Sequence, residues 1–313
     1  MRALVIGPMG QDGTLIKDRI NVNENEVYGL TRNTLLNFSG DKTIEIEKTS
    51  SGNSSDLNRI LNRIKPDLIF HMAAIHGSSN TMHSEIQRNK KEIFDLHVGY
   101  TKSILEWQLN HPYSKSLFAL SSQMYTYSVS NQIIHEETDF SPLNFYGETK
   151  AMALELIREY RSKSRVKTSG LILFNHTSEF NNNKFLFPIL AQQLSSIVQG
   201  GKNQLTLRNP LASIEITSAR EIVDAIILIS ELEESGDFVL AQGVSYEIGK
   251  IIYEVCKILN LTDCNIASVN TPIIEPCLIG NIAKAKKVLN WAPSQKPWEV
   301  LKDMTVKITN INL

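Results

Sequence analysis

The sequence predicts an α/β fold: a doubly wound, mainly parallel sheet followed by a smaller mixed α/β lobe. Strand-length apolar runs alternate with helical runs, a glycine-rich turn follows the first strand, and serines end a later buried strand. The 313 residues are enough for one large α/β unit or two lobes. We expect a Rossmann-type domain over residues 1–175 and a smaller lobe over 176–313, with parts of the second segment returning to the first domain.

The first strand is predicted over Arg2–Ile6, and a turn with three glycines follows it directly, before a helix from about Thr14. Glycines let a backbone approach a pyrophosphate closely, while amides at a helix start supply donors and a favourable dipole. The spacing is G-x-x-G-x-x-G, so it differs from the usual dinucleotide pattern. The turn residues expected to bind a dinucleotide are Gly7, Gly10, Gln11, Asp12 and Gly13.

The second strand, Glu26–Arg32, should end beside the adenosine ribose of such a cofactor. A site selective for NAD usually has an acidic residue there, which accepts from the 2′-hydroxyl. This chain has Arg32 instead and no acidic residue until Asp41, so the sequence favours NADP over NAD.

The next elements alternate as a doubly wound sheet requires. A polar stretch over 33–48 precedes a helix that begins near Ser54 and ends before Pro66. A buried strand then ends in Ala73 and Ala74, small residues against which a cofactor can lie. The remaining expected elements of this region are a long helix over 93–109 and a buried strand over 116–120, which delivers Ser121 and Ser122 to a carboxyl end of the sheet.

Tyr146 and Lys150 carry the strongest chemical signal, because they are spaced one turn apart on a predicted helix. Side chains four residues apart lie on one helical face. The ammonium of Lys150 can lower the pKa of the Tyr146 phenol, which then serves as acid or base, and Lys150 can also reach the cofactor ribose. This arrangement predicts hydride transfer at a carbonyl or alcohol.

Several motifs together resemble the extended short-chain dehydrogenase/reductase family, and within it the GDP-mannose 4,6-dehydratase branch, over nearly the whole chain. They are Gly10–Gly13, the Tyr146/Lys150 pair, Leu173–His176, Leu278–Lys286 and Leu289–Pro293. The resemblance implies that Ser121 hydrogen-bonds the reacting sugar oxygen, that Asn175 faces the substrate and that His176 lies beside the nicotinamide. The substrate-binding residues implied are Ser121, Ser122, Gln123, Asn175 and Arg208.

The chain also departs from this family. The resembling dehydratases have a glutamate two residues after the active serine or threonine, where this chain has Gln123, and an amide cannot act as a carboxylate base. Relatives hold the diphosphate and nucleotide with basic residues where this chain has Ile189, Ile214 and Thr271. The candidates to compensate are Arg208, Lys184 and Arg220. The sequence therefore leaves two questions open: whether the protein eliminates the C6 hydroxyl, and whether it still binds the diphosphate.

Composition narrows the function classes. A net charge of -1 argues against a nucleic-acid or anionic-membrane partner, and the few cysteines and the histidines lack metal-ligand spacing. The lack of such spacing predicts no metal site. No apolar run is long enough to span a bilayer, and we expect a cytoplasmic protein. The family resemblance implies a homodimer or homotetramer.

Two hypotheses from different classes follow. The first is an NADP(H)-dependent enzyme acting at a secondary alcohol or ketone of a nucleotide sugar, with dehydratase-like chemistry, or ketosugar reduction or epimerisation without elimination. The second is a cofactor-binding protein with little turnover, which the changes at 123, 189, 214 and 271 favour and the intact Tyr146/Lys150 pair opposes.

Overall fold

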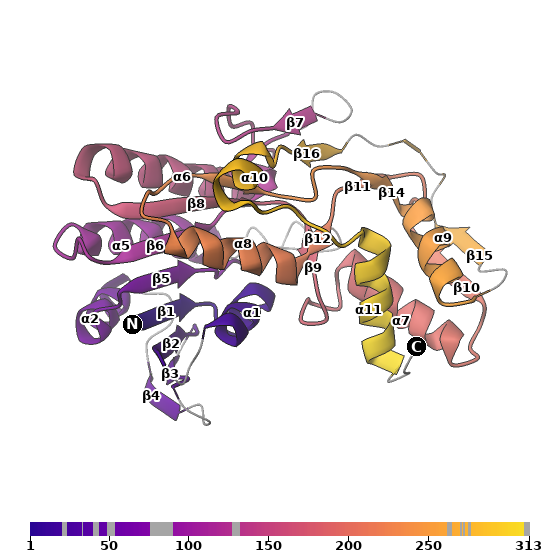
Figure 1. Cartoon of the computed structure of the whole chain (residues 1–313), viewed down its shortest axis with the longest axis horizontal. Helices are drawn as coiled ribbons and strands as arrows, with labels where there is room; N and C mark the ends of the chain where they lie inside the picture. The colour runs from indigo at the N-terminus through magenta and orange to yellow at the C-terminus, as the bar shows by residue number, and fades with distance from the viewer. Residues whose placement is uncertain are drawn as a thin grey trace. The chain divides into compact units, whose positions relative to one another are not determined.

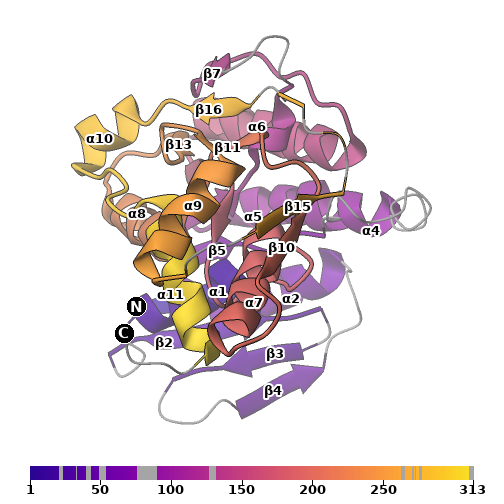
Figure 2. The same cartoon turned by 90° about the vertical axis from the view of Figure 1, so that its right-hand side faces the viewer.

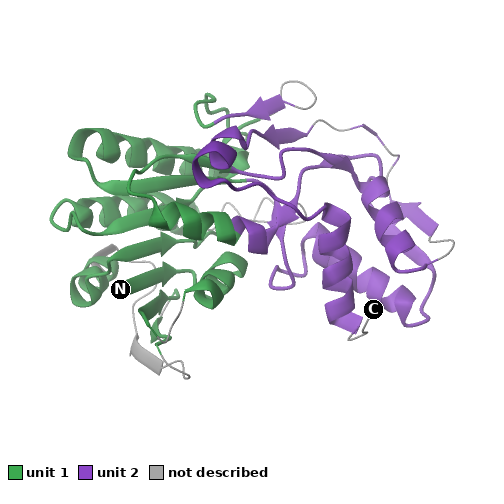
Figure 3. Ribbon diagram, in the orientation of Figure 1, with its two compact units in different colours: residues 1–126, 136–173, 223–239 green, residues 127–135, 174–222, 240–313 purple. Residues whose placement is uncertain are grey.

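The computed structural model describes residues 1–20, 24–32, 34–39, 44–48, 54–75, 90–126, 132–261, 265–269, 271, 273–274 and 277–309. They form two compact units (Figure 3). Unit 1 comprises Met1–Thr126, Glu136–Leu173 and Val223–Val239, and unit 2 comprises Tyr127–His135, Phe174–Ile222 and Leu240–Leu313.

The centre of unit 1 is a mostly parallel sheet with helices on both faces, so the predicted fold class is confirmed (Figure 1). Its described strands are β1 (Arg2–Ile6), β2 (Glu26–Leu30), β3 (Thr34–Asn37), β4 (Ile44–Lys48), β5 (Leu68–His71), β6 (Lys115–Ala119), β8 (Lys167–Leu173) and β13 (Phe238–Leu240). They follow the order β13-β8-β6-β5-β1-β2-β3-β4. The strands from β2 through β1, β5 and β6 to β8 pair in parallel.

The segment expected to be a polar connection after β2 instead extends the sheet. Strand β3 pairs antiparallel with β2, and β4 pairs antiparallel with β3 (Figure 2). The sequence explains part of this difference, since Leu35 of β3 is fully buried while its neighbours Thr34 and Leu36 are half-buried. A single buried position in a four-residue segment is a weak sequence signal for a strand. Pairing with β2 therefore determines that the segment becomes a strand.

The helices of unit 1 begin and end close to their sequence signals. They are α1 (Gln11–Arg19), α2 (Ser54–Ile64), α4 (Lys90–Phe94), α5 (Tyr100–Gln108), α6 (Phe145–Ser164) and most of α8 (Ala219–Glu231). Helix α2 ends as predicted before Pro66, with Lys65 in the left-handed region at φ 50°. On the other side of the sheet, Arg19 of α1 and Asp224 of α8 form an ion pair at 2.6 Å.

The helix predicted over 93–109 contains a wider turn. A π-helical turn, η1 (Asp95–Gly99), separates α4 from α5. Such turns insert one residue into the helical repeat and often occur at functional sites. Here the turn includes the buried His97.

Unit 2 is built around helices α7 (Leu186–Val198), α9 (Ile248–Ile258) and α11 (Pro297–Thr309). Its core includes the fully buried side chains of Leu190, Leu194, Ile251 and Leu301. Small strand pairs complete it: β9 (His176–Thr177) with β12 (Thr217–Ser218), β10 (Gln204–Leu207) with β15 (Asn265–Ser268), β11 (Ser213–Ile214) with β14 (Tyr246–Glu247), and β7 (Gln132–Ile134) with β16 (Leu278–Gly280), followed by α10 (Ala283–Leu289). Among the described helices of both units, none is long and apolar enough to cross a membrane.

Candidate cofactor and catalytic site

The glycine turn after β1 is too tight for side chains. Gly7 has φ +88°, and a Cβ there would lie 2.9 Å from the Cα of Ala73, while a Cβ on Gly13 would lie 2.1 Å from the Gly7 carbonyl oxygen. Helix α1 begins at Gln11, earlier than the expected Thr14, and its N-cap Gly10 makes no side-chain capping bond. The turn thus brings bare backbone to a helix N-terminus, as a pyrophosphate requires.

A cavity of about 630 Å³ opens at the carboxyl ends of β1, β2 and β5. The chain proceeds outward from β1 to β2 on one side and returns to β5 on the other, so the cavity lies at the switch point where open α/β sheets bind ligands. Its described lining includes Gly7, Arg32, Ala73, Ala74 and Tyr100. Four residues predicted from sequence to bind the cofactor are therefore brought together in unit 1.

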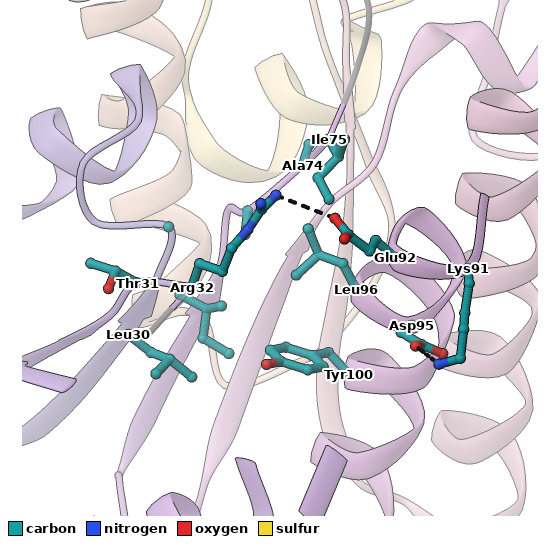
Figure 4. Close-up of a pocket in the computed structure, with 13 residues that line it drawn as sticks. Leu30, Thr31, Arg32, Ala74, Ile75, Lys91, Glu92, Asp95, Leu96 and Tyr100 are labelled. Carbon is teal, nitrogen blue, oxygen red and sulfur yellow. Dashed lines mark hydrogen bonds and ion pairs between the residues drawn. The ribbon is translucent and has the colours of Figure 1, made fainter. Parts of the chain in front are cut away.

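Arg32 is opposed by an acidic residue that the sequence search along β2 did not find. The guanidinium lies 3.5 Å from the carboxylate of Glu92 on α4, across the cavity (Figure 4). The absence of an acidic residue between Arg32 and Asp41 in the sequence therefore does not keep a carboxylate away from Arg32 in the folded protein. Tertiary packing supplies the carboxylate from a helix 60 positions away.

The candidate catalytic side chains meet at the end of β6. Tyr146 and Lys150 lie on α6, and the Tyr146 hydroxyl hydrogen-bonds Ser121, two residues after the last residue of the strand. The Lys150 ammonium donates to the carbonyl oxygen of Ala119 at 2.7 Å and lies 5.8 Å from the centre of the Tyr146 ring. The three residues predicted to form the catalytic group are thus neighbours within unit 1.

The electrostatics of this group differ from the expectation. Burial raises the pKa of Tyr146 to about 12, although the hydrogen bond with Ser121 opposes that rise. Burial lowers the pKa of Lys150 to about 7. Burial is the largest cause of both shifts, and the Lys150 ammonium is directed to the carbonyl oxygen of Ala119.

Gln123 connects the short helix η2 (Ser122–Met124) to the start of α6 by a side-chain hydrogen bond and a close backbone approach. Its side-chain oxygen accepts from the amide of Asn144 at 3.2 Å, and Asn144 caps α6 by accepting from the Gly147 N–H at 2.9 Å. A Cβ on Gly147 would lie 2.1 Å from the Gln123 carbonyl oxygen, so only glycine allows this approach. These contacts join η2, which directly follows Ser121, to the start of the helix that carries Tyr146.

His97 is a neighbour of the site that sequence reasoning missed. Its Nδ1 lies 2.9 Å from the Thr149 hydroxyl, and its ring meets the Tyr146 ring edge-on at 5.2 Å. The Thr149 hydroxyl donates its single proton to the Tyr146 carbonyl oxygen, so it accepts from His97, and we assign the proton of the ring to Nδ1. A buried histidine inside an apolar helical face was the available signal.

Three further predicted site residues, Asn175, His176 and Arg208, belong to unit 2. The Asn175 amide donates to the carbonyl oxygen of Glu215 at 3.1 Å, and Nδ1 of His176 lies 2.7 Å from the Phe174 carbonyl oxygen. Arg208 is exposed after β10. Ser122, in unit 1, is half-buried at the start of η2.

Unit 2 has apolar or neutral side chains at the three positions where a basic residue was sought. Ile214 packs against the hydrophobic core, Ile189 is half-buried on α7, and Thr271 is exposed. Close to Ile214 in sequence, the buried Glu215 carboxylate accepts from the N–H groups of Gly243 at 2.6 Å and Gly280 at 2.8 Å. Burial raises the pKa of Glu215 to about 7 despite these bonds.

Metal-ligand clusters were also sought among the described residues. Within that part of the chain, no group of three His, Cys, Asp or Glu side chains is placed to hold a metal ion.

Comparison with known proteins identifies the family. The family model for GDP-mannose 4,6 dehydratase matches residues 4–304. The chain belongs to the GDP-mannose 4,6-dehydratase family. This confirms the resemblance seen in the sequence and assigns the protein to enzymes of the extended short-chain dehydrogenase/reductase type.

Individual members of this family are distant relatives. The chain is 27% identical over 314 residues to GDP-mannose 4,6 dehydratase 1 of Arabidopsis thaliana, covering 93% of this chain and 85% of that protein. It is 25% identical to GDP-mannose 4,6-dehydratase of Vibrio cholerae, covering 83% and 73%. Among solved structures, RMD from Pseudomonas aeruginosa complexed with NADPH superposes with a TM-score of 0.78 at 17% identity and 99% coverage of both chains, which shows the shared fold.

Proposed function

We propose that this protein is an NADP(H)-dependent enzyme that transfers hydride at a secondary alcohol or ketone of a nucleotide sugar. The observation that carries the proposal is the hydrogen bond between Ser121 and Tyr146, with Lys150 one helical turn away in the same unit as the glycine-lined cavity. The family supports a GDP-mannose 4,6-dehydratase-like activity, and the similar RMD structure contains NADPH.

Each residue has a definable role in this proposal. Gly7, Gly10 and Gly13 would hold the pyrophosphate and Arg32 would face the adenosine end. When bound, the nicotinamide supplies or accepts the hydride. Tyr146 would exchange a proton at its Oη with the sugar oxygen, and Ser121 would hold that oxygen by a hydrogen bond.

A reductase or epimerase without elimination is the second candidate, and two observations favour it. Gln123 has an amide where elimination needs a carboxylate base, and this amide is engaged with Asn144. The Tyr146 phenol hydrogen-bonds Ser121 and carries its proton at neutral pH, so the donor needed to protonate a ketone oxygen that receives hydride is present. Reduction of a 4-ketosugar needs only these groups.

A steady-state assay separates these possibilities. Purified protein would be mixed with NADPH and GDP-, UDP- and dTDP-linked 4-ketosugars, and with NADP⁺ and the parent nucleotide hexoses, while the absorbance of the reduced cofactor is followed. We expect oxidation of NADPH with at least one ketosugar and no loss of the C6 hydroxyl from any hexose. Robust 4,6-dehydration would exclude the second candidate, whereas cofactor binding without any turnover would favour a non-catalytic binding protein.

A further inference from the structure

The wall of the cavity in unit 1 carries charges of both signs. The described lining residues with formal charge are Arg32, Lys91, Glu92 and Asp95, two basic and two acidic, so their net charge is zero. Lys91 and Asp95 pair with each other on one helical face at 2.5 Å. The remaining two, Arg32 and Glu92, point toward one another across the cavity (Figure 4).

The guanidinium of Arg32 and the carboxylate of Glu92 favour different substituents at the 2′ position of an adenosine ribose. A guanidinium is suited to a 2′-phosphate, which it can bind through two donors. A carboxylate accepts a hydrogen bond from a free 2′-hydroxyl and repels a 2′-phosphate. A wall that presents both groups therefore weakens the discrimination that either one would give alone.

Both side chains of the Arg32–Glu92 pair are exposed, so breaking the ion pair costs little free energy. The Arg32 side chain is 61% exposed and the Glu92 side chain 57%, and their closest approach is 3.5 Å. Ion pairs as exposed as this contribute little to stability, because water and salt screen them. The guanidinium is thus available to a ligand, but a phosphate that approaches it also meets the Glu92 charge.

We propose that Glu92 is a specificity-determining residue that limits the NADP(H) preference set by Arg32, so that the protein also accepts NAD(H). This inference rests on the proposed function, since it assumes that the cavity receives the adenosine end of a nicotinamide cofactor. It assigns to Glu92 no role in the hydride or proton transfer. Its effect lies in the ratio of the two binding constants.

The test is equilibrium binding of NADPH and NADH, followed by their fluorescence, to the full chain and to Glu92→Gln, Arg32→Ala and the double variant. We expect Glu92→Gln to raise the NADPH-to-NADH affinity ratio by roughly 3- to 10-fold, as for removal of one screened like charge. Arg32→Ala should lower the ratio, and the double variant should fall between the two. High salt should shrink all these differences.

Glu106→Gln is the matched control. Glu106 lies on α5, pairs with Lys102 at 3.7 Å and is not among the residues that line the cavity. This variant removes the same charge and should leave the ratio unchanged. An equal rise in Glu106→Gln would attribute the effect to net charge and overturn the assignment.

The two possible failures are distinguishable. If both cofactors bind and Glu92→Gln leaves their ratio as in the natural protein, the role of Glu92 is overturned and the proposed function stands. If neither cofactor binds to the natural protein, the proposed function and this inference both fall.

Discussion

The two units of this protein differ in what they retain of a nucleotide-sugar enzyme. In unit 1, the glycine turn, Arg32 and the group formed by Ser121, Tyr146 and Lys150 all occupy one end of the sheet. In unit 2, Ile214, one of the positions where the resemblance led us to expect a basic residue, packs against the hydrophobic core. The residues proposed for hydride and proton transfer thus lie together in unit 1, while unit 2 lacks a basic side chain at the positions where we expected one to hold the diphosphate.

The sharpest test of this contrast is Tyr146→Phe, which removes the proton-exchanging hydroxyl of unit 1. We expect hydride transfer to fall by about 10²- to 10⁴-fold, since that is the usual contribution of acid–base catalysis, while the dissociation constant of NADPH stays the same. Single-turnover oxidation of NADPH and a binding titration measure the two quantities. Tyr160→Phe, a change of the same kind at the other end of α6, should retain activity; unchanged turnover in Tyr146→Phe would place the chemistry elsewhere.

The second test restores a carboxylate to unit 1. Gln123→Glu should create or raise release of a 4-keto-6-deoxy product from a nucleotide hexose, by roughly 10²-fold or more if only the base is missing. Product analysis by mass spectrometry detects the loss of water. Gln123→Ala, which breaks the bond to Asn144 without adding a base, is the control and should give no such product.

The third test concerns the buried carboxylate of unit 2. The pKa of Glu215 is raised from 4.5 to about 7 in the folded protein, so its neutral form favours folding below pH 4.5 and that advantage is lost as the pH rises through 7. The loss amounts to about 3 kcal/mol by linkage. Denaturant unfolding at pH 5 and pH 8 should show a smaller pH dependence in Glu215→Gln than in the natural protein. The exposed Glu247→Gln should keep the natural slope; an identical slope in Glu215→Gln would contradict the assignment.

The smallest expected effect is a gain of binding in unit 2. Ile214→Arg should strengthen binding of a nucleotide diphosphate sugar by about tenfold, since one charge-assisted bond is gained, and should lower stability because Ile214 packs against the core. Isothermal titration with GDP-mannose measures the first effect and thermal unfolding the second. Ile214→Met, which keeps the apolar contact, should bind as the natural protein does. If Ile214→Arg and Ile214→Met bind GDP-mannose with equal affinity, position 214 does not face the diphosphate.

Much of unit 1 could be predicted because its signals are local. The first strand, the glycine turn and the Tyr146/Lys150 spacing are each readable within a few residues, and the structure has all three as elements of one sheet end. What the sequence did not reveal depends on tertiary packing. Glu92 faces Arg32 from a distant helix, and β3 and β4 are strands because β2 offers an edge to β3, which in turn offers one to β4.

The catalytic neighbourhood shows the same limit at finer scale. Spacing predicted that Lys150 would lower the pKa of Tyr146, but a pKa depends on burial and on where the ammonium points. The π turn that directs His97 to Thr149 inserts a residue into a helix whose pattern looked continuous. Only the three-dimensional arrangement distinguishes such a histidine from an ordinary core residue.

The discontinuous composition of unit 1 has a consequence for synthesis of the chain. Arg158 and Arg161 of α6 both pair with the buried Asp237, which lies beside the edge strand β13. A ribosome must therefore make the intervening part of unit 2, through Ile222, before these arginines meet their carboxylate. At about 5–20 residues per second, the unfinished sheet waits several seconds with an open edge at β8. An unpaired strand edge favours aggregation, so the open side of β8 is a site of risk during that interval.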